Sequence, residues 1–249
     1  MRRFGLIGYP LGHSFSKRYF SEKFENEGIS GCVYENYPLA AVGEFPALIK
    51  SVPDLEGLNV TIPYKSSIRE YLDAIDPEAS AVGAVNVLKI RRSDNQTIIS
   101  GFNSDITGIR DSILPVVNEI KQALVLGTGG SSGSVCHVLE QFGVRVIRVS
   151  RRKSADSLTY SDITPELMSR TDLIVNTTPL GMFPDTGARP DIRYDLLDKR
   201  HILFDLVYNP EITLFLEEGQ RRGCTIITGL KMLYSQAEKS WEIWNDKAY

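Results

Sequence analysis

The stretch at residues 123–135 limits the possible folds more than any other part of the 249-residue chain. Residues 123–126 are all apolar and predict a short buried strand, and helical spacing of apolar residues then runs as far as Phe142. Between them lie Gly127, Gly129, Gly130 and Gly133. This order predicts a phosphate-binding turn, because glycines let the backbone approach a phosphate and a helix N-terminus offers unpaired N–H donors.

The glycine spacing is G-x-G-G-x-x-G instead of G-x-G-x-x-G, so the motif alone also fits a plain glycine-rich turn. The flanking sequence favours the dinucleotide interpretation. Residues 144–149 predict a second strand, rich in β-branched side chains, so that strand, helix and strand complete a βαβ unit. We therefore expect a Rossmann-type dinucleotide-binding domain.

The residues after this second strand indicate which dinucleotide is bound. An NAD-binding unit usually ends the strand with Asp or Glu, which holds the ribose 2′-hydroxyl. Here the strand runs into Ser150, Arg151, Arg152 and Lys153, with no carboxylate. Arginine matches phosphate oxygens through its planar fork, so the sequence favours NADP over NAD. The alternative is a solvated run of charge on an exposed loop.

The composition is that of an ordinary globular protein and gives no reason to expect a nucleic acid, a membrane or a metal as a partner. The chain is 42% hydrophobic and 24% charged, with a net charge of −3, so bulk charge does not predict a nucleic-acid surface. No run of about 18 apolar residues predicts a membrane span. Cysteines and histidines do not fall at metal-ligand spacing, and the three scattered cysteines favour a reducing compartment. We expect a cytoplasmic protein with a small-molecule substrate and no metal.

Strands and helices are expected to alternate along the chain, which indicates an α/β fold with mostly parallel sheets. In the first part, strands are expected at 4–7, 32–37, 58–61, 85–90 and 97–100, and helices at 17–27, 42–49, from about 65, and at 105–114. The strands at 85–90 and 97–100 predict a hairpin, so this sheet is mixed. Later strands are expected at 173–175, 202–206 and 224–227.

We expect two α/β domains. Residues 1–101 plus 231–249 would form a substrate-binding, catalytic domain, and residues 102–230 a Rossmann-type NADP-binding domain. The final helix begins near Leu230, after the nucleotide sheet is complete, so it is expected to return to the first domain. No segment is left over as an obvious interface, which favours a monomer or a weak homodimer.

Polar residues collect at the expected carboxyl ends of the first-domain strands, where open α/β sheets bind ligands. They are Ser14, Ser16, Asn59, Thr61, Lys65, Asn86, Asn103 and Asp105. Each has a plainer interpretation as a helix cap, a turn residue or an exposed lysine. Their joint position at one edge favours a site for a small polyhydroxylated acid.

The motifs at 59–65 (NVTIPYK), 83–86 (GAVN) and 101–108 (GFNSDITG) resemble those of the shikimate dehydrogenase family, which includes the quinate/shikimate dehydrogenases. The glycine-rich loop, the NTTPLGM segment at 176–182 and GLKMLYSQA at 229–237 resemble the same family in order and spacing. The resemblance runs from Gly8 to the last helix. It implies reversible reduction of 3-dehydroshikimate to shikimate with NADPH, in chorismate and aromatic amino acid biosynthesis.

By position, the resemblance implies that Lys65 and Asp105 are the catalytic pair. The implied substrate-binding residues are Ser14, Ser16, Asn59, Thr61, Asn86, Tyr208 and Gln236. The implied cofactor-binding residues are Gly127, Thr128, Gly129, Gly130, Ser131, Ser150, Arg151, Arg152, Thr177, Met182, Gly229 and Met232. An ammonium at Lys65 suits the alkoxide that forms from the ketone, and Asp105 can hold Lys65 and a substrate hydroxyl. Which of the two transfers the proton is left open.

One departure from the family pattern bears on the substrate. The family usually has proline after the second serine of its Ser-x-Ser motif, and here Lys17 stands there, adding a cation near the substrate carboxylate if it points inward. Two other functions stay open. One is a quinate/shikimate dehydrogenase that uses NAD, and the other is a non-catalytic dinucleotide-sensing protein on the same scaffold.

Overall fold

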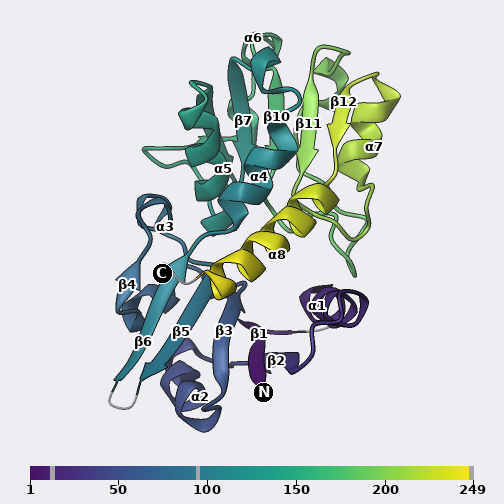
Figure 1. Cartoon of the computed structure of the whole chain (residues 1–249). Coiled ribbons are helices and arrows are strands. Elements are labelled where there is room, and N and C mark those ends of the chain that lie inside the picture. The colour runs from purple at the N-terminus through teal and green to yellow at the C-terminus, as the bar shows by residue number, and fades with distance from the viewer. Residues whose placement is uncertain (12–14, 94–95, 247–249) are drawn as a thin grey trace. The chain divides into compact units, whose positions relative to one another are not determined.

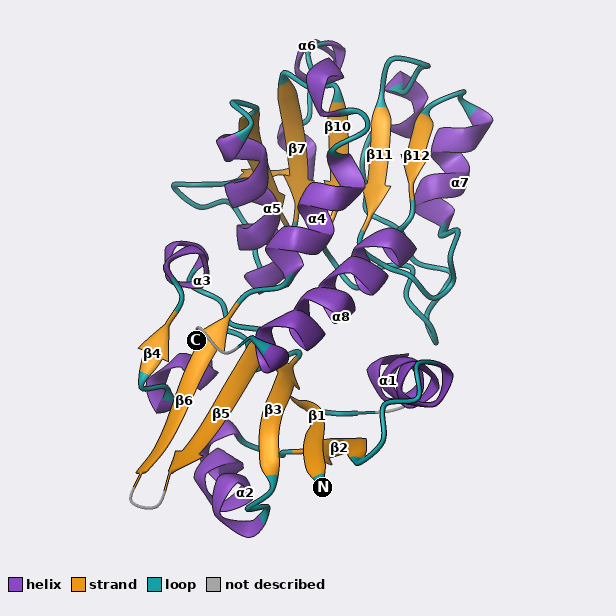
Figure 2. Ribbon diagram, in the orientation of Figure 1, coloured by secondary structure: helices purple, strands orange, loops and turns teal. Residues whose placement is uncertain are grey.

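The computed structural model describes residues 1–11, 15–93 and 96–246. The chain divides into two compact units. Unit 1 consists of Met1–Ser104 together with Ala237–Tyr249, and unit 2 of Asp105–Gln236. Each unit contains its own sheet and its own helices (Figures 1 and 2). The expectation of an α/β fold built on two sheets is therefore confirmed.

Unit 1 is built on a mixed sheet. Its elements are β1 (Arg2–Gly8), α1 (Phe15–Asn26), β2 (Cys32–Pro38), α2 (Phe45–Ser51), β3 (Leu55–Val60), β4 (Ala74–Ile75), α3 (Pro77–Val82), β5 (Val87–Ser93) and β6 (Gln96–Phe102). Within the described residues the strand order is β2-β1-β3-β5-β6-β4. β1 runs parallel to β2 and β3, whereas β5 is antiparallel to both β3 and β6. The expected hairpin inside a mixed sheet is confirmed.

Helices cover the two faces of this sheet because neighbouring residues of a strand point to opposite sides. On β1, Leu6 belongs to a core with α1 and the end of the last helix, whereas Ile7 belongs to a core with α2. Val87 and Leu88 on β5 divide between the two cores in the same way. Both faces are thus apolar, which leaves the strand ends as the place for polar side chains.

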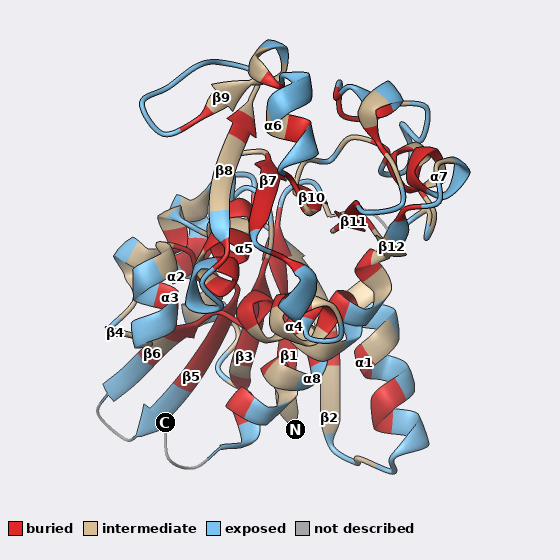
Figure 3. Cartoon of the chain, turned by 90° about the horizontal axis from the view of Figure 1, so that it is seen from above, coloured by how far each residue is buried: buried red, intermediate tan, exposed pale blue. Residues whose placement is uncertain are grey.

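Unit 2 is a doubly wound parallel sheet. Its elements are α4 (Asp105–Ile113), β7 (Gln122–Leu126), α5 (Gly130–Gln141), β8 (Arg145–Ser150), β9 (Leu158–Thr159), α6 (Pro165–Ser169), β10 (Leu173–Asn176), β11 (Ile202–Asp205), α7 (Leu214–Arg221) and β12 (Thr225–Ile227). The order among the described strands is β12-β11-β10-β7-β8-β9, and each pair is parallel. β7 and β10 are buried over their whole length, whereas β8 is partly exposed (Figure 3).

The last helix, α8 (Gly229–Asn245), is shared between the units: it belongs to unit 2 as far as Gln236 and to unit 1 from Ala237 onward. In unit 1 its Trp244 stacks on Phe4, with ring centroids 4.8 Å apart, and donates from Nε1 to the carbonyl oxygen of Leu88 at 3.0 Å. Lys89 in turn donates from Nζ to the carbonyl oxygen of Ile243 at 2.8 Å. The C-terminal half of α8 is therefore part of the first sheet's core, as expected.

The prediction of a helix from about residue 65 is wrong. Only a short 3₁₀ turn at Ser67–Tyr71 is present there. The carbonyl oxygen of Lys65 accepts from the N–H of Val85 at 2.7 Å, which takes it out of the i to i+4 pattern that an α-helix needs. None of the helices in the described part of the chain combines the length and the apolar character needed to cross a membrane.

Gly57 on β3 is required because Trp244 lies against it. A Cβ at this position would lie 2.4 Å from Trp244 Nε1, and the indole is buried and cannot swing away. We therefore expect Gly57→Ala to lower the free energy of unfolding by about 1–3 kcal/mol, measured by urea denaturation. Gly43→Ala is the matched control, because a Cβ there meets nothing closer than 3.9 Å. Equal stability of the two variants would contradict this account of the Trp244 contact.

Candidate functional site

The carboxyl ends of adjacent strands in unit 2 bring the expected cofactor residues to one edge of the sheet. β8, β7, β10 and β11 are neighbours and run parallel. The cofactor residue Ser150 ends β8, and the cofactor residues Gly127 and Thr177 follow β7 and β10. The expected substrate residue Tyr208 follows β11. In open parallel sheets this edge is where nucleotides bind.

The glycine-rich loop has the geometry that a phosphate needs. Gly127 has a φ of +114°, and a Cβ there would lie 2.6 Å from Thr177 Oγ1, so only glycine fits. Gly129 is the N-cap of α5, and a Cβ there would meet nothing within 4 Å. The backbone at the helix N-terminus is thus open to a ligand, and its N–H groups suit an anion. The residues present fit the pyrophosphate of a dinucleotide.

Thr177 ties the loop after β10 to the end of β7. Its backbone N–H and its Oγ1 both donate to the carbonyl oxygen of Leu126, at 3.0 Å and 2.7 Å. The N–H of Gly127 donates to the carbonyl oxygen of Val149 at 2.8 Å, which links the same loop to β8. The start of the glycine-rich loop is therefore held from both sides, whereas Met182, farther along the loop after β10, is exposed.

The basic run at the end of β8 is exposed. Ser150 is the last residue of β8 and donates from Oγ to the carbonyl oxygen of Arg152, which bends the chain back on itself. Arg151, Arg152 and Lys153 that follow it are exposed to solvent. These three cations are suited to bind a ribose 2′-phosphate, and no carboxylate among them would repel it.

A buried carboxylate, Asp205, fixes the segments around the end of β11. Its Oδ1 accepts from Asn176 Nδ2 and from the N–H of Val207, each at 3.0 Å, and its Oδ2 accepts from Thr213 Oγ1 at 2.6 Å. Asn176 Oδ1 in turn accepts from the N–H of Thr178 at 3.0 Å. One side chain therefore joins the loop after β10, the turn that leads to Tyr208, and the N-cap of α7. Sequence analysis missed Asp205.

Three of the expected residues lie on successive turns of α8, namely Gly229, Met232 and Gln236. A Cβ on Gly229 would lie 2.7 Å from the carbonyl oxygen of Val207, and a Cβ on Gly108 would lie 2.6 Å from that of Met232. The N-terminal half of α8 therefore packs closely on α4 and on the turn before Tyr208. Burial raises the pKa of the Tyr208 phenol, which keeps its proton on the oxygen.

In unit 1, hydrogen bonds link the segment of Lys65 with the chain that leads to Asp105. Lys65 accepts at its carbonyl from the N–H of Val85 at 2.7 Å. One residue before Val85, the carbonyl of Ala84 accepts from Asn103 Nδ2 at 2.8 Å, and Ser104 N–H donates to Asn86 Oδ1 at 2.7 Å. These hydrogen bonds fix the backbone before Asp105 against the segment of Lys65. Asp105 itself is buried.

A second set of contacts joins two expected substrate residues, Asn59 and Asn86, through other buried side chains. Tyr34 Oη on β2 donates to Asn59 Oδ1 at 2.8 Å. Asn59 Nδ2 donates to Ser240 Oγ on α8 at 2.9 Å. Ser240 Oγ lies 3.2 Å from Ser104 Oγ, which accepts from Asn86 Nδ2 at 3.1 Å. No sequence signal marked Tyr34 or Ser240, since each has the pattern of an ordinary strand or helix residue. Ser104 lies inside the motif at 101–108, where no role was predicted for it.

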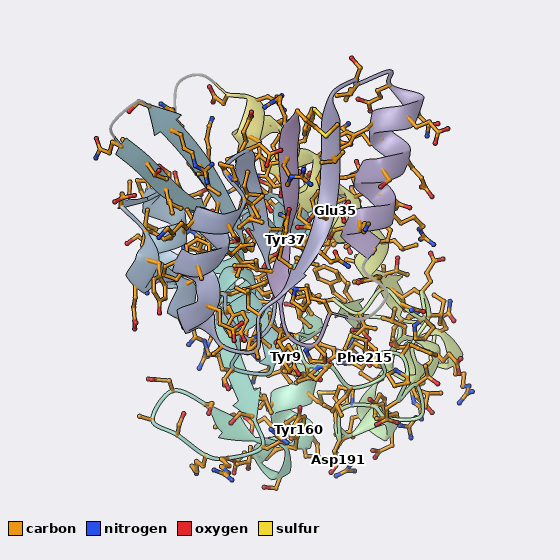
Figure 4. The ribbon with its side chains drawn as sticks, turned by 90° about the horizontal axis from the view of Figure 1, so that it is seen from below. Tyr9, Glu35, Tyr37, Tyr160, Asp191 and Phe215 are labelled. Carbon is orange, nitrogen blue, oxygen red and sulfur yellow. The ribbon has the colours of Figure 1, made fainter. Side chains whose placement is uncertain are left out.

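The remaining expected residues are placed as follows. Thr61 lies directly after β3 and donates its N–H to the carbonyl oxygen of Ile7 at 2.9 Å. Ser14 lies outside the described residues. The ammonium of Lys17 lies 2.7 Å from the carboxylate of Glu35 on β2, so it forms an ion pair on this unit's surface. Figure 4 shows Glu35 and Tyr37 along the same strand.

Comparisons with known proteins relate the whole chain to one family. Residues 6–88 match the family model described as the shikimate dehydrogenase substrate binding domain. The shikimate dehydrogenase (NADP(+)) of Methanococcus aeolicus is 36% identical, over 96% of this chain and 90% of that protein. The crystal structure of shikimate dehydrogenase from Aquifex aeolicus superposes with a TM-score of 0.86 at 28% identity, covering 98% of this chain and 92% of that one. The Thermus thermophilus enzyme, in complex with NADP(H) and shikimate, has a TM-score of 0.85 at 29% identity, covering 98% and 94%.

Asp205 gives unit 2 a pH-dependent contribution to stability with a definite sign. Burial raises the pKa of Asp205 from 3.8 to about 6, so the native state holds more protons than the unfolded state between about pH 4 and about pH 6. The free energy of unfolding therefore falls as the pH rises through this range, by at most about 3 kcal/mol from this group. We expect Asp205→Asn to abolish this contribution, so that the stability of wild type relative to the variant declines from pH 4 to pH 7 in urea denaturation.

Asp195→Asn is the control for this measurement. The Arg193 guanidinium holds the pKa of the Asp195 carboxyl below its usual range, so removing this carboxyl changes the pH dependence in the opposite direction. A stability difference between wild type and Asp205→Asn that stays constant with pH would contradict the prediction.

Proposed function

Because the chain belongs to the shikimate dehydrogenase family, we propose that it catalyses the reversible, NADPH-dependent reduction of 3-dehydroshikimate to shikimate. The observation that carries the proposal is the full-length similarity to a shikimate dehydrogenase (NADP(+)). The presence of both Lys65 and Asp105 supports it, since a dinucleotide-sensing relative would need neither. In this assignment the protein is an oxidoreductase of chorismate and aromatic amino acid biosynthesis.

Unit 2 is proposed to hold NADP. Gly127–Ser131 would hold the pyrophosphate through backbone N–H groups, and Ser150, Arg151 and Arg152 would hold the 2′-phosphate. Thr177, Met182, Gly229 and Met232 complete the proposed cofactor set. The bound cofactor supplies or removes the hydride. The open backbone at Gly129 and the exposed basic run support this assignment.

Lys65 and Asp105 are proposed as the catalytic pair. As the ketone is reduced, its oxygen gains negative charge and then takes up a proton. The ammonium of Lys65 is of the right sign to stabilise that charge, and Asp105 is suited to orient Lys65 and bind a substrate hydroxyl. Two hydrogen bonds support this pairing, because they fix the backbone of both segments before substrate binds. Val85 N–H donates to the carbonyl oxygen of Lys65, and Ser104 N–H donates to Asn86 Oδ1.

The proposed substrate set consists of Ser14, Ser16, Asn59, Thr61, Asn86, Tyr208 and Gln236. Hydroxyls and amides are suited to a compound that carries a carboxylate and several hydroxyls, because they offer both donors and acceptors. The expectations of a cytoplasmic location, of no nucleic-acid partner and of a monomer or weak homodimer stay predictions.

Steady-state oxidation of shikimate and of quinate, each with NADP and with NAD, tests the proposal directly. We expect shikimate with NADP to give the highest kcat/KM, because the run from Ser150 to Lys153 offers cations and no acid for the 2′-position. Comparable rates with quinate or with NAD would instead favour the broader quinate/shikimate branch. Binding of NADPH without turnover of either acid would contradict the enzyme assignment and favour a dinucleotide sensor.

Lys65→Met tests the role given to the lysine. We expect kcat to fall by about 10²- to 10⁴-fold while KM for shikimate changes by no more than a few-fold, because the ammonium acts mainly on charge that develops in the transition state. Lys50→Met is the matched control, since Lys50 lies exposed on α2 in the same unit. An unchanged kcat, or a rise in KM that accounts for the whole loss of kcat/KM, would contradict the assignment.

A further inference from the structure

The contacts between Tyr34 and Asn86 form one continuous hydrogen-bonded chain in unit 1. The chain runs through Tyr34, Asn59, Ser240, Ser104 and Asn86. Tyr34, Asn59 and Asn86 are nearly inaccessible, and Ser104 and Ser240 are fully buried. The five residues come from β2, β3, α8, the segment after β6 and the segment before β5. Two of them, Asn59 and Asn86, are proposed substrate residues.

The direction of the hydrogen bonds is fixed by the chemistry of the partners. The carbonyl oxygen of Asn86 can only accept, and Asn59 Nδ2 lies 3.4 Å from it, so the amino group of Asn59 points that way. Asn59 Oδ1 therefore faces Tyr34, whose single proton is donated to it.

Asn59 is thus fully engaged by the protein as a donor. One N–H is directed to Ser240 Oγ and the other to the carbonyl of Asn86. If the Tyr34 hydroxyl is lost, Asn59 Oδ1 loses its donor inside the core, which lets the Asn59 side chain turn away.

We propose that Tyr34 and Ser240 are positioning residues of the substrate site, which hold Asn59 and Asn86 in one arrangement before the ligand binds. This inference rests on the proposed function. The energetic benefit is preorganisation: side chains that are already ordered lose less conformational freedom on binding. Because the held residues bind the substrate and do not transfer the proton, loss of the chain weakens binding more than it slows chemistry.

Tyr34→Phe isolates the hydroxyl from the ring. The ring of Tyr34 stacks on Phe20 with centroids 4.7 Å apart and 15° between planes, and phenylalanine keeps that contact. Alternation along β2 directs Tyr34 to the opposite face of the sheet from Glu35, so the exposed Lys17–Glu35 ion pair is not the group being altered. Ser240→Ala removes the next link with little change in volume.

The experiment measures kcat and KM for shikimate, KM for NADP, and Tm with and without shikimate. For Tyr34→Phe and for Ser240→Ala we expect KM for shikimate to rise about tenfold, equivalent to about 1.4 kcal/mol. We expect kcat and KM for NADP to stay within about threefold of wild type, and the stabilisation by shikimate to shrink. In the double variant KM should rise by less than the product of the single effects, because both residues act through Asn59.

Two matched controls remove a buried hydroxyl elsewhere. Tyr194→Phe deletes a buried phenol that donates to the carbonyl of Pro190 at 2.7 Å, and Ser112→Ala deletes a buried helical hydroxyl that donates to the carbonyl of Gly108 at 2.7 Å. We expect both controls to lower Tm without raising KM for shikimate. The inference is overturned if Tyr34→Phe and Ser240→Ala behave in the same way, or if their effects on KM simply multiply.

Failure of the inference can be told from failure of the proposed function. A wild type that oxidises shikimate, with variants that keep its KM, overturns only the positioning role. A wild type that neither oxidises shikimate nor gains stability from it overturns both.

Discussion

Much of this structure depends on one constraint, which is that the two halves of α8 belong to different units. The first half of the helix packs so closely on α4 and on the turn after β11 that Gly108 and Gly229 admit no side chain. The second half places Trp244 in the core of unit 1, against Gly57 and under Phe4. One continuous helix must therefore fit two cores, and its length and register cannot change without disturbing either. Two of its polar residues, Gln236 and Ser240, lie near the position where it passes from one unit to the other.

The two units have one feature in common. In each of them, buried side chains hold the residues that are proposed to contact ligands. In unit 2 the carboxylate of Asp205 collects three donors and so fixes two loops and a helix cap. In unit 1 the Tyr34–Asn59–Ser240 chain links two strands, β2 and β3, to the last helix. Burying such groups costs stability unless every partner is present. Both networks therefore restrict which residues can occupy these positions, and they order the proposed site before a ligand binds.

How far the sequence predicts the fold depends on the range of the interactions involved. The β7–α5–β8 unit follows from local periodicity and glycine placement, and the structure has it within a residue or two of the expected bounds. The helix expected from residue 65 fails because a distant residue, Val85, takes the carbonyl of Lys65. Helices α3 and α7 were not predicted, although the sequence contains their N-cap residues. These are Asp76, which precedes Pro77, for α3 and Thr213 for α7.

The candidate site divides in the same way. The glycine-rich loop, the basic run and the motif residues are visible as sequence patterns. The Lys17–Glu35 ion pair depends on where β2 lies beside α1, which periodicity does not reveal. Tyr34, Ser240 and Asp205 matter because residues up to about two hundred positions apart meet through them, as Asn59 and Ser240 do. No local signal encodes such a meeting.

Unit 2 is an uninterrupted stretch of chain inserted within unit 1, and this has a consequence for biosynthesis. During translation the strands of unit 1 emerge early, yet Trp244 and Ser240, which complete their core and their polar chain, are made only after all of unit 2. Until then that face of the first sheet is covered by α1 but not by α8, while synthesis proceeds at about 5–20 residues per second. The strands of unit 2 can pair meanwhile, so on the ribosome we expect the sheet of unit 2 to form before α8 completes the core of unit 1.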